Sequence, residues 1–159
     1  ISDEKKDLII LTSIGRIFNF NLSNKFLTAT SKQSQGLIIT KLLPTEKIVS
    51  CCTYHNGENI FLISKKGRFF SINSNEIYYS NEYSLGYLNE KTKLKNDQFL
   101  KILPSSHYLD IETNKNKSVR IDLNKLNFSS NKSNFLIDFL KLDENEYLEN
   151  CFRLENFLD

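Results

Sequence analysis

The sequence predicts an all-β fold, built as a propeller-like repeat of about three four-stranded blades. The main observation is a long internal repeat: residues 8–26, LIILTSIGRIFNFNLSNKF, return as residues 60–78, IFLISKKGRFFSINSNEIY. Both copies contain an apolar run, a polar Gly-Arg turn, an alternating run and a polar corner. A repeat period near 50 residues is typical of stacked or radially arranged supersecondary units.

The second half of the unit also repeats, and a third, more divergent copy follows. The segment SQGLIITKLLPTEKIV at residues 34–49 corresponds to SLGYLNEKTKLKNDQFL at 84–100. In the third copy Asn116 stands where the first two have Gly15 and Gly67, and Asn follows Gly in its tolerance of a left-handed turn. The repeat divides one domain, residues 1–159, into three units with these approximate limits: 7–55, 56–105 and 106–155.

Within each unit the hydrophobic pattern favours strands over helices. Continuous apolar runs at residues 8–11 and 60–63 predict buried strands, and the alternation at residues 18–22 predicts a half-exposed strand. Residues 47–54 and 98–103 are predicted to be further strands. Each unit would therefore hold about four strands, as a propeller blade does.

Two further segments carry local structural signals. Asn56-Gly57 is a dipeptide typical of β-hairpins. Residues 135–140 have apolar residues at helical spacing, but the repeat aligns them with a strand, and we follow the repeat.

Composition indicates a globular domain without a metal or disulfide framework. The chain has 159 residues, 40% of them hydrophobic, and no Met, which suggests an excised fragment. No apolar run is long enough for a membrane span. Cys51 and Cys52 are adjacent in a predicted strand and should point to opposite faces, and we expect buried, reduced thiols. With only His55 and His107 as further ligands, a metal site is not expected.

Charge is unevenly distributed along the chain. The first unit, with residues 1–6, carries seven basic and four acidic residues, and residues 55–104 carry seven and five. Residues 105–159 carry seven basic and ten acidic residues. The acidic end is either a solvated blade face or a segment that competes with a polyanion for the basic turns.

The turn motifs resemble a known family. Residues 13–16, SIGR, and 64–68, SKKGR, resemble the TSKGR turn of the C-terminal domain of the DNA gyrase A protein. Residues 31–37, SKQSQGL, resemble that family's GRNTQGV corner, and residues 41–49, KLLPTEKIV, resemble its IKLKEGDEVV segment. The order and spacing of these motifs also match the family.

The resemblance implies a β-pinwheel, a propeller-like ring of about six blades that binds and wraps DNA around its rim. This chain would form about half of such a ring. The QRRGGKG box that marks gyrase wrapping is not present, since residues 31–36 read SKQSQG. The related A protein of topoisomerase IV lacks a clean box, so the motifs do not separate the two proteins.

Basic residues recur at equivalent places in the units. A circular track of positive charge suits the phosphate backbone, which requires charge at intervals and no base code. The alternative is that these are ordinary solvated lysines of turns. The predicted DNA contacts are Arg16, Lys32, Lys41, Lys65, Lys66, Arg68, Lys91, Lys93, Lys115 and Lys117.

No catalytic constellation is visible, and no cofactor is expected. Tyr78 and Tyr79 lie where the repeat has Phe26 and Phe128, which indicates packing. The chain is therefore interpreted as a non-enzymatic accessory domain of a gyrase-like type IIA topoisomerase, in the bacterial cytoplasm or a plastid-type organelle. Its partners would be duplex DNA, a gyrase B-type ATPase subunit and the remainder of the gyrase A-type subunit. The alternative is a protein-interaction propeller whose DNA binding has decayed.

Overall fold

A computed structural model describes residues 6–22, 40–81, 84–88, 93–125, 137–138 and 140–153. Nearly all its regular structure is β. The elements are β1 (Asp7–Thr12), β2 (Ile17–Phe20), β3 (Ile48–Tyr54), β4 (Asn59–Ser64), β5 (Arg68–Asn73), the 3-10 helix η2 (Ser74–Glu76), β6 (Phe99–Pro104), β7 (Tyr108–Thr113), β8 (Ser118–Asp122), the 3-10 helix η4 (Leu123–Lys125), β9 (Ile137–Asp138) and β10 (Leu148–Arg153).

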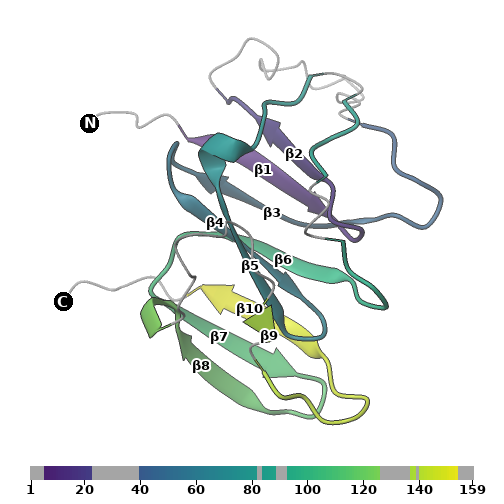
Figure 1. Ribbon diagram of the computed structural model, residues 1–159, viewed down its shortest axis with the longest axis vertical. Coiled ribbons are helices and arrows are strands. Elements are labelled where there is room, and N and C mark those ends of the chain that lie inside the picture. Colours follow the sequence, from purple (N-terminus) through teal and green to yellow (C-terminus); the bar gives the residue numbers. More distant parts are fainter. Residues whose placement is uncertain are drawn as a thin grey trace, which may run out of the picture.

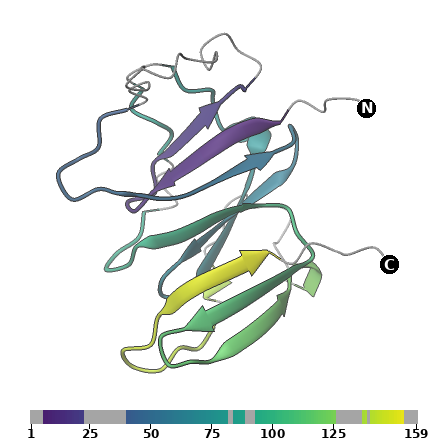
Figure 2. The same cartoon turned by 180° about the vertical axis from the view of Figure 1, so that it is seen from behind.

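Within the described residues these strands form three antiparallel sheets, stacked one above another along the long axis of the molecule (Figure 1). The strand orders are β2-β1-β3, β6-β4-β5-β9 and β10-β7-β8. The view from behind shows the same three layers (Figure 2). The predicted all-β repeat is confirmed, with three or four named strands in each sheet.

The turn that follows the first strand of each unit has the predicted backbone. Gly15, Gly67 and Asn116 have φ angles of 92°, 78° and 58°, which places all three in the left-handed region. An added Cβ at Gly15 would lie 2.7 Å from Cε2 of Phe99, so both conformation and space require glycine there. Asn116 tolerates the same conformation without a glycine.

Two apolar layers hold the sheets together. The first lies between the first two sheets and contains Ile9 and Leu11 from one and Leu62 and Phe70 from the other, all fully buried. The second layer lies between the second and third sheets and is described below. At roughly 1.5–3 kcal/mol for each large apolar side chain, such burial is the main stabilising term of the stack.

Neighbouring units also share strands. The amide of Ile17 in β2 donates to the carbonyl of Tyr87 at 2.9 Å, and the amide of Tyr87 donates back to the carbonyl of Ile17 at 2.7 Å. In the same way β9, from the third unit, pairs with β5 of the second unit through Phe69 and Ile137. Each of the first two sheets is thus extended by a segment of the next unit.

Two local predictions were wrong. The Asn56-Gly57 turn exists, but it connects β3 to β4, which belong to different sheets, so it is not a hairpin. The strand at Phe18–Leu22 is not half-exposed, because Asn19 is buried. The side chain of Asn19 accepts a hydrogen bond from the Tyr54 hydroxyl at 2.7 Å and donates to the Ile77 carbonyl.

The segment with the ambiguous spacing is described only in part. Residues 137–138 form strand β9, in agreement with the repeat. Residues 135, 136 and 139 lie outside the described residues.

Candidate nucleic-acid interface

The three glycine or asparagine turns lie on the same side of the stack, at the right in Figure 1 and at the left in Figure 2. They connect β1 to β2, β4 to β5, and β7 to β8. Beside each turn lies the loop that leads into the last strand of the unit. The amides of Ser13, Lys65 and Asn114 donate to the carbonyls of Lys47, Gln98 and Tyr147, which fixes each turn against its loop. The repeat therefore produces three equivalent turn-and-loop sites on one side.

In the first turn the predicted DNA contact Arg16 is buried. Its guanidinium donates Nε to Glu46 Oε1 at 2.7 Å, pairs with Glu46 Oε2, and donates to the carbonyls of Lys41 and Leu85. It also lies 5.3 Å from the centre of the Phe18 ring. This differs from our expectation for Arg16: its donors are used inside the protein, so the residue ties the turn to the loop rather than facing a phosphate.

The partner carboxylate is strongly acidic. Burial raises the pKa of Glu46, but hydrogen bonds from Arg16, the Leu43 amide and Thr12 outweigh it and lower the pKa to about 2. Glu46 is therefore ionised at neutral pH and completes a buried ion pair. Removal of one partner of such a buried ion pair strongly destabilises the protein, because the remaining charge is left buried and unpaired.

In the third turn the cations are held by acidic groups of their own loop. Lys117 Nζ lies 2.9 Å from Asp143 Oδ2 and 3.2 Å from Glu146 Oε2, while Lys115 Nζ lies 3.9 Å from Asp143 and donates to the Glu144 carbonyl. The hydrogen bonds that Lys117 donates to Asp143 and Glu146 raise its pKa. Both lysines remain partly exposed, but their field is offset locally by the loop.

The second turn presents its basic residues around two adjoining hollows. One hollow, of about 630 Å³, is lined by Lys66, Arg68 and Lys141 together with residues 140, 142, 143 and 145–147 of the third unit. The other, of about 560 Å³, is lined by Lys65, Lys66, Tyr147 and residues 96–98. The Leu148 amide donates to the Lys65 carbonyl at 2.7 Å, which holds this turn against the third unit. Within the part of the chain that the structure describes, the ammonium groups of Lys65 and Lys66 form no ion pair.

The remaining predicted contacts are dispersed. Lys41 and Lys93 are exposed, and they line neither hollow. Lys32 and Lys91 lie outside the described residues. The packing predicted for Tyr78 and Tyr79 is wrong for Tyr78, which is 81% exposed, whereas the Tyr79 hydroxyl donates to Asp7 Oδ2.

Sequence reasoning did not single out Tyr147, which lines both hollows and is 42% exposed. Its equivalents by hydrogen bonding in the other units are Lys47 and Gln98, whereas the repeat in the sequence aligned Tyr147 with Phe99 and did not mark it as a surface residue. Only the packing of the third loop beside the second turn reveals the position.

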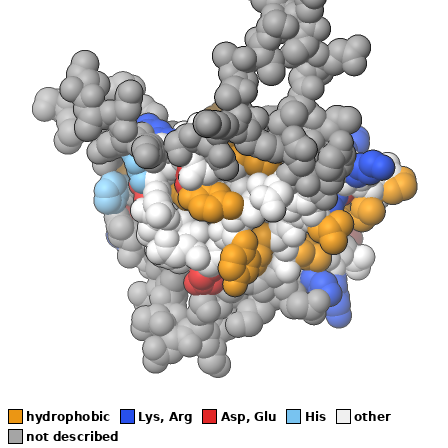
Figure 3. All heavy atoms as spheres, turned by 90° about the horizontal axis from the view of Figure 1, so that it is seen from above, with side chains coloured by type: hydrophobic (Ala, Val, Ile, Leu, Met, Phe, Trp, Pro, Cys, Tyr) orange, Lys and Arg blue, Asp and Glu red, His pale blue; other side chains and the backbone are white. Residues whose placement is uncertain are grey.

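Elsewhere the described residues offer little site chemistry. The expectation of buried thiols holds for Cys151 and is wrong for Cys51, which is exposed. Among them, no group of three or more His, Cys, Asp or Glu is placed to hold a metal ion. None of their helices is long and apolar enough to cross a membrane. The end of the stack above the first sheet exposes hydrophobic side chains, with Lys and Arg toward its margins (Figure 3).

Comparison with known proteins places these turns in a family context. The family model for the DNA gyrase C-terminal domain, beta-propeller, matches residues 6–51 and 58–77. The DNA gyrase A protein of Borreliella burgdorferi is 28% identical over 121 residues, which is 75% of this chain and 14% of that protein. The chain is similar to the gyrase A C-terminal domain over these residues. The resemblance predicted from the turn motifs is confirmed.

Solved structures agree with this relationship. A DNA gyrase A C-terminal domain matches with a TM-score of 0.65 at 25% identity, covering 77% of this chain and 40% of the other. The C-terminal domain of a DNA topoisomerase IV matches with a TM-score of 0.73 at 17% identity, covering 96% and 48%. The E. coli ParC C-terminal domain matches with a TM-score of 0.64 at 13% identity, covering 95% and 63%. The last two likenesses concern the fold alone, and they confirm the propeller-like class.

Proposed function

We propose that this relative of the gyrase A C-terminal domain binds duplex DNA through the phosphate backbone, mainly at its second turn. The observation that carries the proposal is the group formed by Lys65, Lys66, Arg68 and Lys141 around two adjoining hollows. Backbone contacts need positive charge at intervals and no donor pattern for the bases, and no sequence preference is expected.

The other two turns would contribute less. Arg16 is committed to Glu46, and Lys115 and Lys117 are paired with Asp143. A phosphate at the third turn would have to compete with this carboxylate. The track of positive charge would therefore be uneven, with its strongest segment at the second unit; Lys41 and Lys93 are exposed but line neither hollow.

The wider role follows from the family. The domain would be an accessory part of a gyrase A-type subunit, working with a gyrase B-type ATPase subunit in a bacterial nucleoid or a plastid-type organelle. It would hold a duplex segment for strand passage, and it would have no catalytic activity alone. The wrapping of DNA around the rim belongs to the same proposal.

The test is a double substitution, Lys65→Ala with Lys66→Ala, measured by fluorescence anisotropy on two unrelated duplexes. Affinity at low salt should fall about tenfold for both duplexes, and the slope of log K against log salt should become shallower by up to about 2, since each phosphate contact contributes roughly 0.9. Neither ammonium group forms an ion pair within the described residues, so the fold should be unaffected.

The matched control is Lys6→Ala with Lys125→Ala, which removes the same charge from exposed positions on the opposite side of the stack. If both double variants weaken binding equally, only the net charge matters and the proposed surface is wrong. If neither changes a measurable affinity, DNA is held elsewhere on the chain.

A second candidate function is a protein-interaction module whose DNA binding has decayed. The local neutralisation of Lys115 and Lys117 favours it, as does the low net charge of +2. Parent protein that fails to bind either duplex at about 50 mM salt, where phosphate contacts are strongest, would favour this module.

A further inference from the structure

Each sheet of the stack has one face that points toward the following unit, which we call the forward face. Because side chains alternate along a strand, the register defines this face residue by residue. In the first unit it carries Ile9, Leu11 and Ile17, which are buried in the first apolar layer. All three are at most 1% exposed.

The forward face of the second unit repeats this arrangement. Phe61, Ile63 and Phe69 pack in the second apolar layer, and the Phe61 and Phe69 rings lie 5.3 Å apart. They face Leu109 and Ile111 of the third unit, which are also buried. An apolar forward face is thus what receives the next sheet.

At the equivalent positions the third unit has polar and charged residues. Glu112 and Ser118 of the third unit correspond to Leu11 and Ile17 of the first and to Ile63 and Phe69 of the second. Asp110 and Arg120 of the third unit correspond to Ile9 and Asn19 of the first and to Phe61 and Ser71 of the second.

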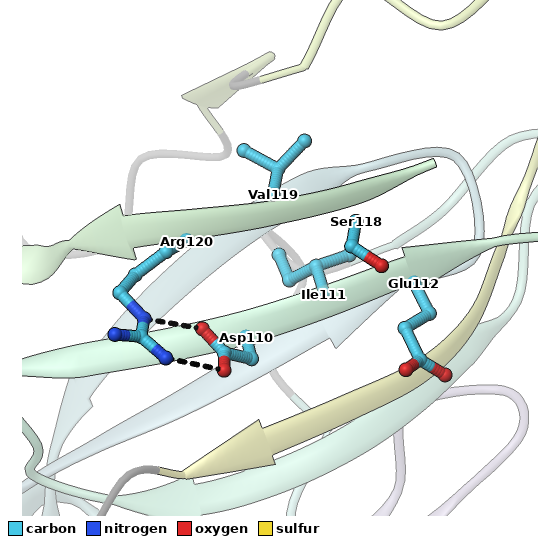
Figure 4. Close-up of a pocket in the computed structure, with 6 residues that line it drawn as sticks. All are labelled: Asp110, Ile111, Glu112, Ser118, Val119 and Arg120. Carbon is cyan, nitrogen blue, oxygen red and sulfur yellow. Dashed lines mark hydrogen bonds and ion pairs between the residues drawn. The ribbon is translucent and has the colours of Figure 1, made fainter. Parts of the chain in front are cut away.

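These side chains form a polar surface that is adapted to water. The Arg120 guanidinium donates to Asp110 Oδ1 at 2.8 Å and Oδ2 at 2.9 Å (Figure 4). Glu112 accepts from Asn150 at 3.2 Å. They line a shallow hollow of about 350 Å³ with Ser118 and Val119. A second sheet laid over them would remove water from three charged groups without supplying partners, which is strongly unfavourable.

The edge of the third sheet is also unsuited to a further strand. Thr113 and Lys117 exchange a backbone hydrogen bond, so the next pair, Glu112 and Ser118, is unbonded and the Ser118 amide points away from β7. The equivalent amide of Ile17 is bonded to Tyr87 of the next unit. In the described part of the chain the Ser118 amide has no partner. Charged residues such as Arg120 on such an edge oppose the addition of a strand.

We propose that the forward face of the third unit is the solvent-facing end of the blade stack. No further blade packs on it, whether from a longer chain or from a second copy, and no strand is added to β8. This proposal concerns assembly and does not depend on DNA binding.

The direct test is amide hydrogen exchange in the longest chain that contains these residues. The Ser118 amide should exchange at least about 100-fold faster than the Ile17 amide, because the latter is hydrogen-bonded between units. Comparable protection of both amides would show that another blade or strand covers β8 and would overturn the proposal.

Grafting the apolar forward face of the second unit onto the third unit tests whether polarity keeps the third unit's face free of other sheets. The variant Asp110→Phe, Glu112→Ile, Ser118→Phe and Arg120→Ser copies the forward face of the second unit. By sedimentation the parent should keep one mass over about a hundredfold range of concentration, and the folded graft should self-associate. A folded graft that stays monomeric would overturn the role of polarity. Parent protein that associates with its Ser118 amide protected would overturn the proposed end face.

Discussion

The cation that follows each turn glycine or asparagine has a different environment in each unit. Arg16 is buried against Glu46, Lys117 is shared by Asp143 and Glu146, and Arg68 lines an open hollow. The carboxylate that faces this position is repeated in the first and third units, as Glu46 and Glu146. In the second unit its equivalent is Asp97, whose Oδ1 accepts from the Lys66 and Gln98 amides instead.

The buried ion pair of Arg16 and Glu46 should make the stability of the protein depend on pH. The unfolded Glu46 carboxyl binds its proton near its ordinary pKa of 4.5, whereas the folded one does so only at about 2. The stability from this group is therefore complete above pH 4.5 and is lost as the pH falls toward 2. Glu46→Gln should lower the free energy of unfolding by about 3 kcal/mol at pH 7 and by much less at pH 2.

Chemical denaturation at the two pH values measures this difference. The control is Glu144→Gln, an exposed carboxyl in the equivalent region of the third unit, which should change stability by less than about 0.5 kcal/mol. A loss for Glu46→Gln that is the same at both pH values would contradict the lowered pKa.

Alanine substitutions at two turn glycines separate the cost of the left-handed backbone from the cost of a close contact with the added Cβ. Gly15 and Gly57 have similar φ angles of 92° and 88°, but a Cβ at Gly57 meets nothing within 4 Å. Gly57→Ala should cost about 1–2 kcal/mol from the backbone alone, and Gly15→Ala should cost more because Phe99 must move. Thermal unfolding of the two variants gives the comparison. Equal losses would mean that the close contact with Phe99 is without consequence.

Among the elements, the segments that one unit contributes to the sheet of the preceding unit are very short: a bridge at Tyr87 and the strand β9. The bridge at Tyr87 and the two-residue strand β9 close the edges of β2 and β5. Neither has enough hydrogen bonds to stand alone, so both depend on the apolar layers beside them. Their role is to couple one unit to the next.

Tyr87→Pro tests this coupling. Proline removes the amide that donates to the Ile17 carbonyl, and the expected loss is about 2 kcal/mol. Exchange of the β2 amides should accelerate even though the substitution lies in the second unit. Tyr87→Phe, which keeps the backbone, is the control and should leave β2 unchanged. If acceleration is confined to the second sheet, the bridge does not couple the units.

The repeat in the sequence was sufficient to predict the strands, the left-handed turns and the all-β class, because glycine placement and apolar runs are local signals. It could not show that β3 and β4 enter different sheets, since Asn56-Gly57 has the same local chemistry in either case. It also placed Arg16 with the exposed cations, because the facing carboxylate of Glu46 lies 30 positions away. The sheet that each strand joins and the burial of Arg16 depend on contacts between distant segments, which the repeat does not reveal.

At the scale of the whole molecule, the acidic third unit shapes the electrostatic field. Asp143 and Glu144 are both exposed; Asp143 lines the 630 Å³ hollow, and the Glu144 carbonyl accepts from Lys115 at the third turn. Glu146 belongs to the same loop but is buried, and hydrogen bonds from the Asp143 amide, Thr113 and Lys117 lower its pKa. Its role is structural, so it should not be neutralised in a test of the field.

Neutralising the exposed pair, by Asp143→Asn with Glu144→Gln, should tighten DNA binding about two- to fivefold at 50 mM salt. The gain should fade at high salt, because charges beyond a Debye length of about 10 Å at 0.1 M are screened. Anisotropy at two salt concentrations measures it. Glu76→Gln with Glu112→Gln, the same change in charge at exposed positions elsewhere, is the control. Equal gains from both pairs would mean that the loop has no special position relative to DNA.

The shared strands also set an order for folding during synthesis. The first sheet receives its outer segment from Tyr87, more than thirty residues after β3 ends at Tyr54, and the second receives β9, more than thirty residues after β6 ends at Pro104. A unit emerging from the ribosome therefore stays incomplete until most of its successor has been made. At about 5–20 residues per second, β2 keeps an open edge for some seconds. The charged edge of β8 has no such wait, because it needs no successor.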